Sequence, residues 1–294
     1  MNSLDAWDEV RTAYHVARVG TVSGAADALG VHHATVIRHI DALEQRLGTK
    51  LFQRHARGYT ATEAGLDLLQ VAKATDDQFS QLAGRIKGRG EEVTGELIVT
   101  SIPSLSPSLS ATLARYSRAN PQVVLRFMTD ERLFRLEYGE AHVAIRAGKR
   151  PDQPDNVVQK FFELSHALYA TQDYVAEMGA LDEGDMARHR FVTEDDRESR
   201  APFYRWLHEM VPDRCISYRA SAQRSVVDAI RAGAGVGFLP VAMGERSPDL
   251  VQMMPSKPEW TATVWLVTHV DLHRTAKVQS ILTHLKEDFD PGSF

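Results

Sequence analysis

Three histidines and an arginine lie within ten residues, VHHATVIRHI, at positions 31–40. A metal ion would need two ligands four residues apart or an HExxH pair, with cysteine or carboxylate partners. Neither spacing occurs in this stretch. Catalysis would need a nucleophile or an acid beside a histidine in a cleft, and a projecting helix offers neither. The chemistry that remains is contact with an acidic partner.

The charge around this stretch favours nucleic acid as that partner. Residues 31–58 hold five arginines and lysines against two acidic residues, a local +3 in a chain whose formal net charge is −5. Such a basic patch is the electrostatic footprint of duplex DNA. On a helical wheel Val36, Ile40 and Leu43 form one apolar face, so Arg38 points to the opposite side.

The elements that would position these residues follow the helix-turn-helix pattern. Apolar residues three and four apart predict a first helix over 7–17. Ser23 is expected to cap a short second helix that ends at Gly30, and Val31 to be a buried residue of the turn. The stretch TKLFQRHARGYTAT, at 49–62, predicts two short strands around a tip, which form a wing.

Val36, Ile40, Leu43 and Leu47, spaced four, three and four apart, predict a third helix. Its exposed residues then have expected roles on DNA. The first residues of a recognition helix reach base edges, where His33 can donate to guanine and Arg38 can bind guanine or a phosphate. Ile37 fits two roles, contact with a thymine methyl and packing on the wing. Arg54 suits a phosphate and Arg57, at the wing tip, a minor groove. The expected DNA-binding residues are His32, His33, Ala34, Thr35, Ile37, Arg38, Arg54 and Arg57.

A long helix and a domain of another class follow the wing. Apolar or small residues alternate four and three positions apart from 68 to 86, a period typical of a coiled-coil seam between two chains. Packing on the helix's own domain is the alternative, but no local partner is apparent in the sequence. GRGEEVTGE, at 88–96, predicts a hinge. Strands and helices alternate beyond it, including a helix over 130–140, and predict a parallel sheet. The seam residues are Leu68, Ala72, Thr75, Phe79, Leu82 and Ile86.

The composition narrows the class of protein further. A single cysteine, Cys215, leaves no disulfide within the chain and fits a reducing compartment. The N-terminus lacks the apolar core of a signal peptide, and no run of about 18 apolar residues predicts a membrane span. We therefore expect a cytoplasmic protein with no catalytic residue, no metal and no cofactor.

Residues 20–65, GTVSGAADALGVHHATVIRHIDALEQRLGTKLFQRHARGYTATEAG, resemble the LysR-type transcriptional regulators. They match the family pattern AA..L.V....V...I..LE..LG..LF.R....LT.AG at nearly every anchor. The similarity is closest to the subgroup with a His-Ala-Thr-Val run in the recognition helix. YGEAHVAIRAG and RAGAGVGFLP are similar to signatures of the family's effector domain, so the resemblance covers the whole chain.

The resemblance implies a fold and an assembly. It implies a winged helix-turn-helix, a linker helix that dimerises, and a periplasmic-binding-protein-like effector domain of two α/β lobes. It also implies a homotetramer, built as a dimer of dimers, on an interrupted palindrome in promoter DNA. The expected domains are 1–61 for DNA binding, 62–90 for the linker helix and 91–294 for the effector. Lobe I then spans about 91–164 and 266–294, and lobe II about 165–265.

Effector contacts are expected at the carboxyl ends of the strands, between the lobes. Ser101, Ser104 and Ser106 follow the first strand at a helix start whose free N–H groups favour an anion, although serines are also ordinary caps. If Ser101 and the helix start anchor the effector, a small organic acid is the first expectation. The resemblance adds four residues, of which Arg146 would suit a carboxylate but could equally be a solvated loop arginine. The four added residues are Thr129, Arg146, Thr193 and Gly235.

The chain departs from the family pattern at five positions. Ile37 stands where serine or threonine is usual, and His39 replaces glutamine or arginine, so no operator sequence can be carried over. Ala13 and Ala61 replace a phenylalanine and a leucine, and His142 replaces an aspartate.

Three other classes of protein fit parts of the pattern. A solute-binding protein shares the two-lobe fold but has no use for the first 90 residues. An enzyme would show a catalytic triad, a metal cluster or a phosphate loop, and GAGVG at 233–237 lacks the GxGxxG spacing. A purely architectural DNA binder would not need the domain over 91–294. A transcription regulator that responds to a small-molecule effector accounts for all parts.

Overall fold

The computed structural model describes residues 7–55, 58–86, 93–199 and 201–292; in the last turns of the longest helix it describes the side chain of Phe79 alone. The chain forms two compact units. One comprises Met1–Glu92 with Arg135–Glu140, and the other Val93–Phe134 with Ala141–Phe294. Most of the predicted hinge at 88–96 lies outside the described residues.

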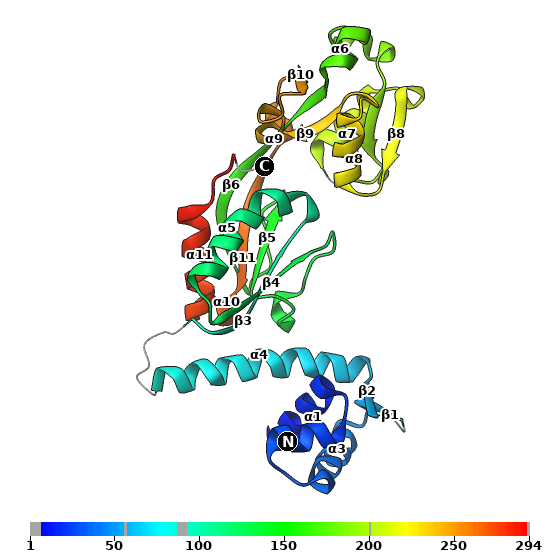
Figure 1. Cartoon of the computed structure of the whole chain (residues 1–294). Coiled ribbons are helices and arrows are strands. Elements are labelled where there is room, and N and C mark those ends of the chain that lie inside the picture. The colour runs from blue at the N-terminus through cyan, green and yellow to red at the C-terminus, as the bar shows by residue number, and fades with distance from the viewer. Residues whose placement is uncertain (1–6, 56–57, 87–92, 200, 293–294) are drawn as a thin grey trace. The chain divides into compact units, whose positions relative to one another are not determined.

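The N-terminal unit is a helix-turn-helix with a wing and a long helix (Figure 1). The apolar stripes of its first three helices meet in one core that includes Val16, Ala25, Ile40 and Leu43. This arrangement confirms the predicted helix-turn-helix and wing. The elements are α1 (Trp7–Val19), α2 (Val22–Leu29), α3 (His33–Leu47), β1 (Phe52–His55), β2 (Gly58–Ala61) and α4 (Glu63–Ile86).

Two local predictions in this unit are wrong. The N-cap of α2 is Thr21, whose Oγ1 accepts a hydrogen bond from the Gly24 N–H at 3.2 Å, rather than Ser23. Val31 is 40 % exposed rather than buried. The turn is closed by its backbone, because Gly30 adopts a left-handed conformation and the Val31 N–H bonds to Ala26 O, so the Val31 side chain is not needed inside.

Helix α4 packs on its own unit. Leu68 joins the helix-turn-helix core, and Phe79 meets Trp7 of α1 edge to face, with ring centroids 6.0 Å apart. The premise that α4 has no local partner is therefore wrong. The side chains of Leu82 and Ile86, predicted in the same seam, lie outside the described residues.

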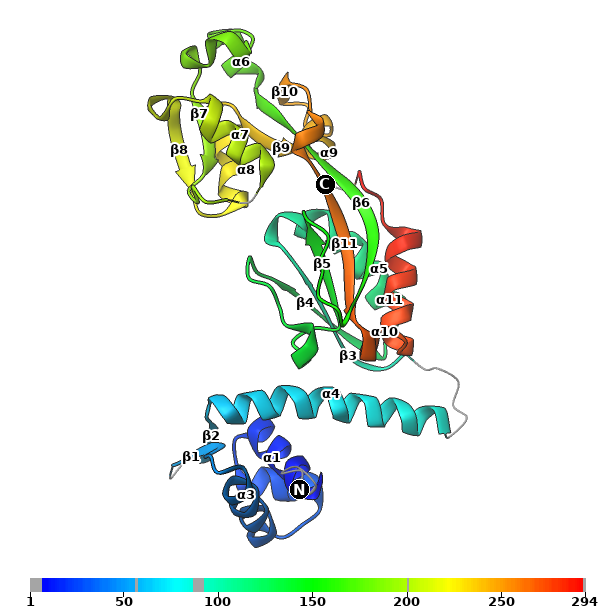
Figure 2. The ribbon, with the colours of Figure 1, turned by 180° about the vertical axis from the view of Figure 1, so that it is seen from behind.

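The second unit is built on a mixed sheet, visible from both sides in Figures 1 and 2. Its order is β10-β6-β11-β5-β3-β4, with β9 paired to β6. Only β3, β4 and β5 run parallel; the other pairs are antiparallel, so the predicted all-parallel sheet is wrong in part. These strands are β3 (Gly95–Ser101), β4 (Val123–Thr129), β5 (Val143–Ala147), β6 (Asn156–Thr171), β9 (Gly237–Pro240), β10 (Leu250–Met254) and β11 (Thr261–His269).

The helix predicted over 130–140 is wrong. The segment has only the single turn η2 (Leu136–Tyr138). Asp130 accepts a hydrogen bond from the Arg132 N–H, and Glu140 accepts one from the Arg135 N–H. Such local side-chain bonds compete with helical ones, which explains the failure of the periodicity.

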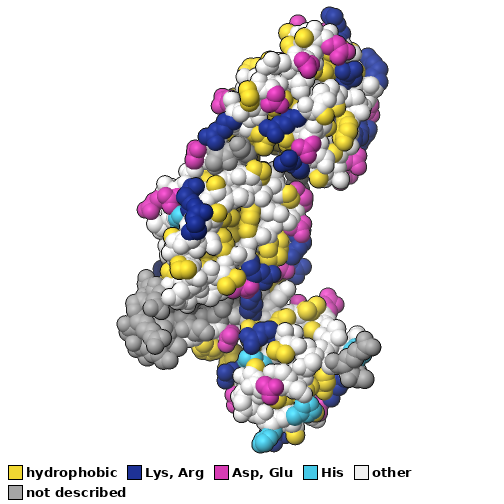
Figure 3. Space-filling view, in the orientation of Figure 1, with side chains coloured by type: hydrophobic (Ala, Val, Ile, Leu, Met, Phe, Trp, Pro, Cys, Tyr) yellow, Lys and Arg dark blue, Asp and Glu magenta, His cyan; other side chains and the backbone are white. Residues whose placement is uncertain are grey.

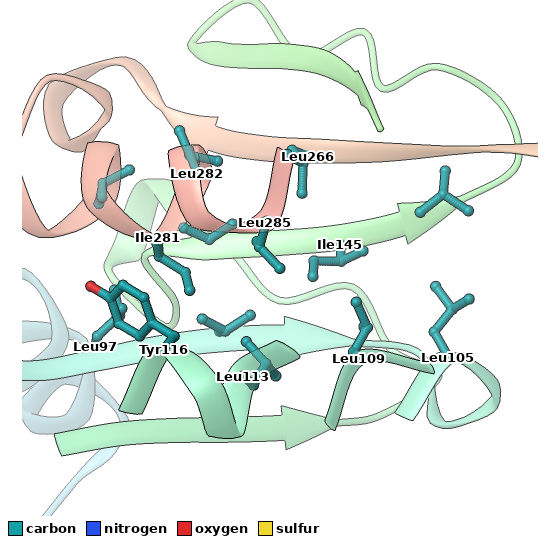
Figure 4. Packing of buried hydrophobic residues seen from close by; sticks show 14 of the residues in the cluster. Leu97, Leu105, Leu109, Leu113, Tyr116, Ile145, Leu266, Ile281, Leu282 and Leu285 are labelled. Carbon is teal, nitrogen blue, oxygen red and sulfur yellow. The ribbon is translucent and has the colours of Figure 1, made fainter. Parts of the chain in front are cut away.

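Each lobe of this unit has its own core. In the first lobe, Leu109 and Leu113 of α5 (Ser106–Ala119) and Ile281 of α11 (Ala276–Asp288) cover strand residues, as Figure 4 shows. In the second lobe, aromatic residues pack around Trp260, which is fully buried. Strand β6 contributes to both cores and so joins the lobes. The second lobe also contains β7 (Phe191–Glu194), α7 (Pro202–Met210), β8 (Ile216–Ala220) and α8 (Gln223–Arg231).

Among the helices that the structure describes, none is both long and apolar enough to cross a membrane. Over the same described residues, no group of three or more histidine, cysteine or acidic side chains is placed to hold a metal ion.

Candidate DNA interface and effector site

The N-terminal end of α3 presents polar side chains to solvent. His32 is the N-cap with an extended backbone, and His32, His33, Ala34 and Arg38 are all exposed. Val36, on the opposite face, is fully buried. Figure 3 shows histidine side chains gathered on the surface of this unit. The face predicted to read DNA is therefore exposed.

Two predicted contacts on α3 are less exposed. Thr35 and Ile37 are both half-buried. Ile37 packs against the helix-turn-helix core, which favours the packing role for that side chain over a thymine contact.

The wing is held to α3 by ion pairs. Arg54 of β1 bonds to Asp41, and its Nη2 also donates to Glu44 Oε2 at 3.2 Å. The guanidinium carbon of Arg54 lies 5.3 Å from the centroid of the Tyr59 ring. Arg54 is therefore engaged within the protein, whereas Arg57 of the wing tip lies outside the described residues.

Glu44 organises this junction, and sequence reasoning missed it. Its side chain is only 2 % exposed, and its Oε1 accepts hydrogen bonds from the backbone N–H groups of Leu51 at 3.0 Å and Phe52 at 3.2 Å. Lys50 Nζ donates to Oε2 at 2.6 Å. Burial alone would raise the pKa of Glu44, but these hydrogen bonds outweigh it and hold the pKa below its usual value. The signal in the sequence was an acidic residue directly beside the apolar face of α3.

Three residues of the predicted effector site lie together in the first lobe. Ser101 ends β3 and is in register with Thr129 on one side and with Ile145, the neighbour of Arg146, on the other. Ser101 is 5 % exposed, and its Oγ has no hydrogen-bond partner among the residues that the structure describes. Thr129 is exposed. The carboxyl ends of three neighbouring strands thus bring these positions together.

The groups expected to bind an anion are partly occupied. The Nη2 of Arg146 donates to Phe134 O at 2.9 Å. Ser104 and Ser106 are half-buried at the start of α5, and the turn before it begins with Pro103, which has no N–H to offer.

In the second lobe, Thr193 and Gly235 differ in role. Thr193 of β7 is fully buried, and its Oγ1, like that of Ser101, lacks a partner within the described part of the chain. A Cβ on Gly235 would lie 2.4 Å from Arg190 O. Gly235 therefore permits a close backbone approach, which accounts for the glycine without any ligand.

Two carboxyl groups missed by sequence reasoning, Glu131 and Glu194, interact across the lobes. Burial is the main cause that raises the pKa of Glu194, and the negative charge of Glu131 raises this pKa further. The Ser199 hydroxyl donates a hydrogen bond to the Glu194 carboxylate at 3.1 Å and lowers the pKa. Burial and the charge of Asp130 raise the pKa of Glu131. The turn η1 (Pro103–Leu105) of the first lobe also contacts α8 of the second. The sequence signal was weak, because an acidic residue at the end of a strand, like Glu194 in β7, or just after one, like Glu131 after β4, is common.

A winged helix-turn-helix joined to a two-lobe α/β domain defines a DNA-binding regulator with its own ligand-binding domain. The family model "Bacterial regulatory helix-turn-helix protein, lysR family" matches residues 7–66, and the model "LysR substrate binding domain" matches residues 90–290. The chain belongs to the LysR family of transcriptional regulators. Members bind promoter DNA and small-molecule effectors and are not enzymes.

Named relatives cover most of the chain. The transcriptional activator IlvY of Salmonella typhimurium is 29 % identical over 252 residues, covering 83 % of this chain and 85 % of IlvY. The regulator DmlR of Escherichia coli is 25 % identical over 299 residues, covering 98 % and 96 %.

Solved structures share the fold. A full-length OxyR variant from Pseudomonas aeruginosa has a TM-score of 0.68 at 18 % identity, covering 95 % of this chain and 94 % of OxyR. Full-length CbnR with its target DNA has a TM-score of 0.57 at 19 % identity, covering 95 % and 98 %.

Proposed function

We propose that α3 reads promoter DNA through its exposed N-terminal face and that the wing adds contacts. The observation that carries this is Arg38, exposed on the side opposite the buried Val36. Arg54 supports the wing through its ion pairs with Asp41 and Glu44, and its role toward DNA is proposed to be a phosphate contact. From the His-Ala-Thr-Val run we also propose that the chain belongs to the subgroup of the family with that run in the recognition helix. The proposed DNA-binding residues are His32, His33, Ala34, Thr35, Arg38, Arg54 and Arg57, and Ile37 is proposed to support α3 by packing on the core.

The effector is proposed to bind between the lobes, at the strand ends that carry Ser101, Thr129 and Thr193. The buried hydroxyls of Ser101 and Thr193 have no hydrogen-bond partner among the described residues, and they support this site because a ligand would satisfy them. Arg146 and the serines at 104 and 106 suit a carboxylate, whereas Glu131 and Glu194 suit a hydrogen-bond donor. A small molecule with both a carboxylate and a protonated amine meets both demands. Gly235 supports this site only through the packing of the second lobe.

The assembly is proposed to be a dimer through α4 and a homotetramer of two such dimers in the cytoplasm. Large apolar side chains on α1 and α4 support it: Trp7 is 60 % exposed, Phe79 56 %, and Leu66 and Val71 51 % each. Two-fold symmetry suits a palindrome with two half-sites. Light scattering in solution should give four times the chain mass of 32.8 kDa. A stable monomer would reject the assembly.

The test of DNA reading is a salt-titrated binding assay on the promoter DNA beside this protein's own gene. We expect Arg38→Ala to weaken selective binding by about 1–3 kcal/mol. Arg118→Ala, an exposed arginine of α5, serves as the control and should bind as the wild type does. Binding that is unselective and indifferent to Arg38→Ala would reject the proposal.

The effector class is tested on the same protein by thermal shift. Amino acids, dicarboxylates and diamines are compared at equal concentration. If an amino acid stabilises the protein and neither the dicarboxylates nor the diamines do, both charged groups are required and the effector is a zwitterion. Stabilisation by the dicarboxylates alone would reject it.

A further inference from the structure

A hydrogen bond joins the recognition helix to the first helix. Thr12 of α1 is 3 % exposed, and its Oγ1 lies 2.9 Å from Nδ1 of His39 in α3. The same Thr12 hydroxyl donates to Asp8 O at 2.6 Å. Both contacts fall on one oxygen atom.

These two contacts fix which nitrogen of His39 carries a proton. A carbonyl oxygen such as Asp8 O can only accept, so the single hydroxyl hydrogen of Thr12 is used there. The Thr12 oxygen then has only lone pairs for His39, and Nδ1 must donate. The bond therefore needs an N–H at the δ position of residue 39, in the neutral and in the protonated imidazole alike.

A second bridge lies on the same side of α3. Arg46, two turns further along, pairs with Glu9 of α1 at 3.1 Å. Helix α1 in turn contacts α4, where Trp7 meets Phe79. Helix α1 thus lies between the recognition helix and the linker helix, and the His39–Thr12 hydrogen bond is a polar contact that joins α1 to α3.

We propose that His39 is a positioning residue for DNA recognition. Its Nδ1–H holds α3 at a fixed angle to α1, and so to α4, which sets how Arg38 and its neighbours meet the bases. His39 then acts through Thr12 rather than by touching DNA. The proposal rests on the proposed DNA reading by α3.

Substitutions at residue 39 can keep a nitrogen at the Nδ1 position, at the Nε2 position or at neither. Asparagine places an N–H donor where Nδ1 stands, next to Cγ. Glutamine places its amide one bond further out, near the position of Nε2, which a histidine contacting DNA would use. Alanine removes both.

The experiment measures dissociation constants of four single variants and one double variant on the promoter DNA, at a temperature where denaturation curves show each to be folded. His39→Ala and His39→Gln should bind about three- to tenfold more weakly, the worth of one net hydrogen bond. His39→Asn should stay within about twofold of wild type. Thr12→Val should lose as much as His39→Ala, and the double variant no more than either.

Two outcomes would overturn the inference. Rescue by glutamine but not asparagine, with a lower salt dependence for His39→Ala, would make His39 a phosphate contact. Wild-type affinity of Thr12→Val would remove the bond from DNA recognition altogether. Arg38→Ala is measured beside them: if it has no effect, the DNA reading by α3 itself fails, a result distinct from failure at His39.

Discussion

The carboxylate of Glu44 accepts a hydrogen bond at 3.0 Å from the backbone N–H of Leu51. Glu44 belongs to the recognition helix, and Leu51 leads into the wing. The wing N–H groups at 51 and 52 have a buried acceptor, so the wing and α3 are held as one body. The two elements proposed to contact DNA are thereby aligned in the DNA-free protein.

Glu44→Gln should lower the free energy of unfolding by about 1–3 kcal/mol, because the bonds that it accepts lose their ionic partner. The effect depends on pH. The pKa of Glu44 is lower in the folded chain than the value of about 4.3 in unfolded chains, so its stabilisation is full above that value and is lost as pH falls through the folded pKa. Denaturant unfolding at pH 7 and pH 3 checks this: the difference in unfolding free energy between the variant and wild type should be smaller at the lower pH.

The matched control is Asp67→Asn, on an exposed carboxylate of α4. It should leave the unfolding free energy within about 0.5 kcal/mol at both pH values. An equal loss in both variants would show a general charge effect rather than the Glu44 junction.

Arg54→Ala should lower the stability of the protein, and its effect on DNA binding should be secondary to that loss. The guanidinium pairs with Asp41 and the buried Glu44, so its loss should cost about 1 kcal/mol of unfolding free energy. Arg38→Ala should leave stability within about 0.5 kcal/mol, because Arg38 is exposed. Denaturant melts and salt-titrated DNA binding separate the two. Unchanged stability with a lower salt slope would make Arg54 a phosphate contact only.

The sequence predicted the helix-turn-helix and wing because each element there has a local signal. Helical spacing of apolar residues, a glycine after α2 and alternation around the wing are all short-range patterns. The N-cap of α2 could not be predicted from residue types alone. Thr21 and Ser23 are both good caps, and only the backbone geometry selects Thr21. The helix over 130–140 failed since side-chain bonds to the backbone replaced helical ones.

In the candidate site, too, local features were predicted from the sequence and long-range contacts were not. Exposure of Arg38 follows from the helical wheel, and the meeting of Ser101 with Thr129 follows from parallel strands. Long-range contacts could not be predicted: β6 pairs antiparallel across both lobes, and Glu131 acts on Glu194 from a distant part of the chain. The tie between Thr12 and His39 spans two helices, and no spacing in the sequence encodes it.

Glu194→Gln should stabilise the effector-free protein at pH 7.5 by less than about 1 kcal/mol, since the half-buried Glu194 carboxylate is partly screened by solvent. Burial and Glu131 raise the folded pKa of Glu194, so its ionisation opposes folding as pH rises from about 4.3 through that folded pKa. The gain should vanish at pH 4, where the carboxyl is neutral. Thermal unfolding at both pH values checks it, with Glu198→Gln, an exposed neighbour, as the unchanged control.

Gly235→Ala separates packing from ligand contact. An added Cβ would lie 2.4 Å from Arg190 O, so the second lobe must shift, and we expect a loss of more than about 2 kcal/mol in unfolding free energy. Gly184→Ala is the control, because its Cβ would meet only Asp182 Oδ1 at an ordinary 3.4 Å. Below its unfolding temperature, the Gly235 variant should bind the stabilising amino acid with unchanged affinity. Normal stability combined with lost binding would instead place Gly235 against the effector. The added methyl group would then block the ligand rather than disturb the packing.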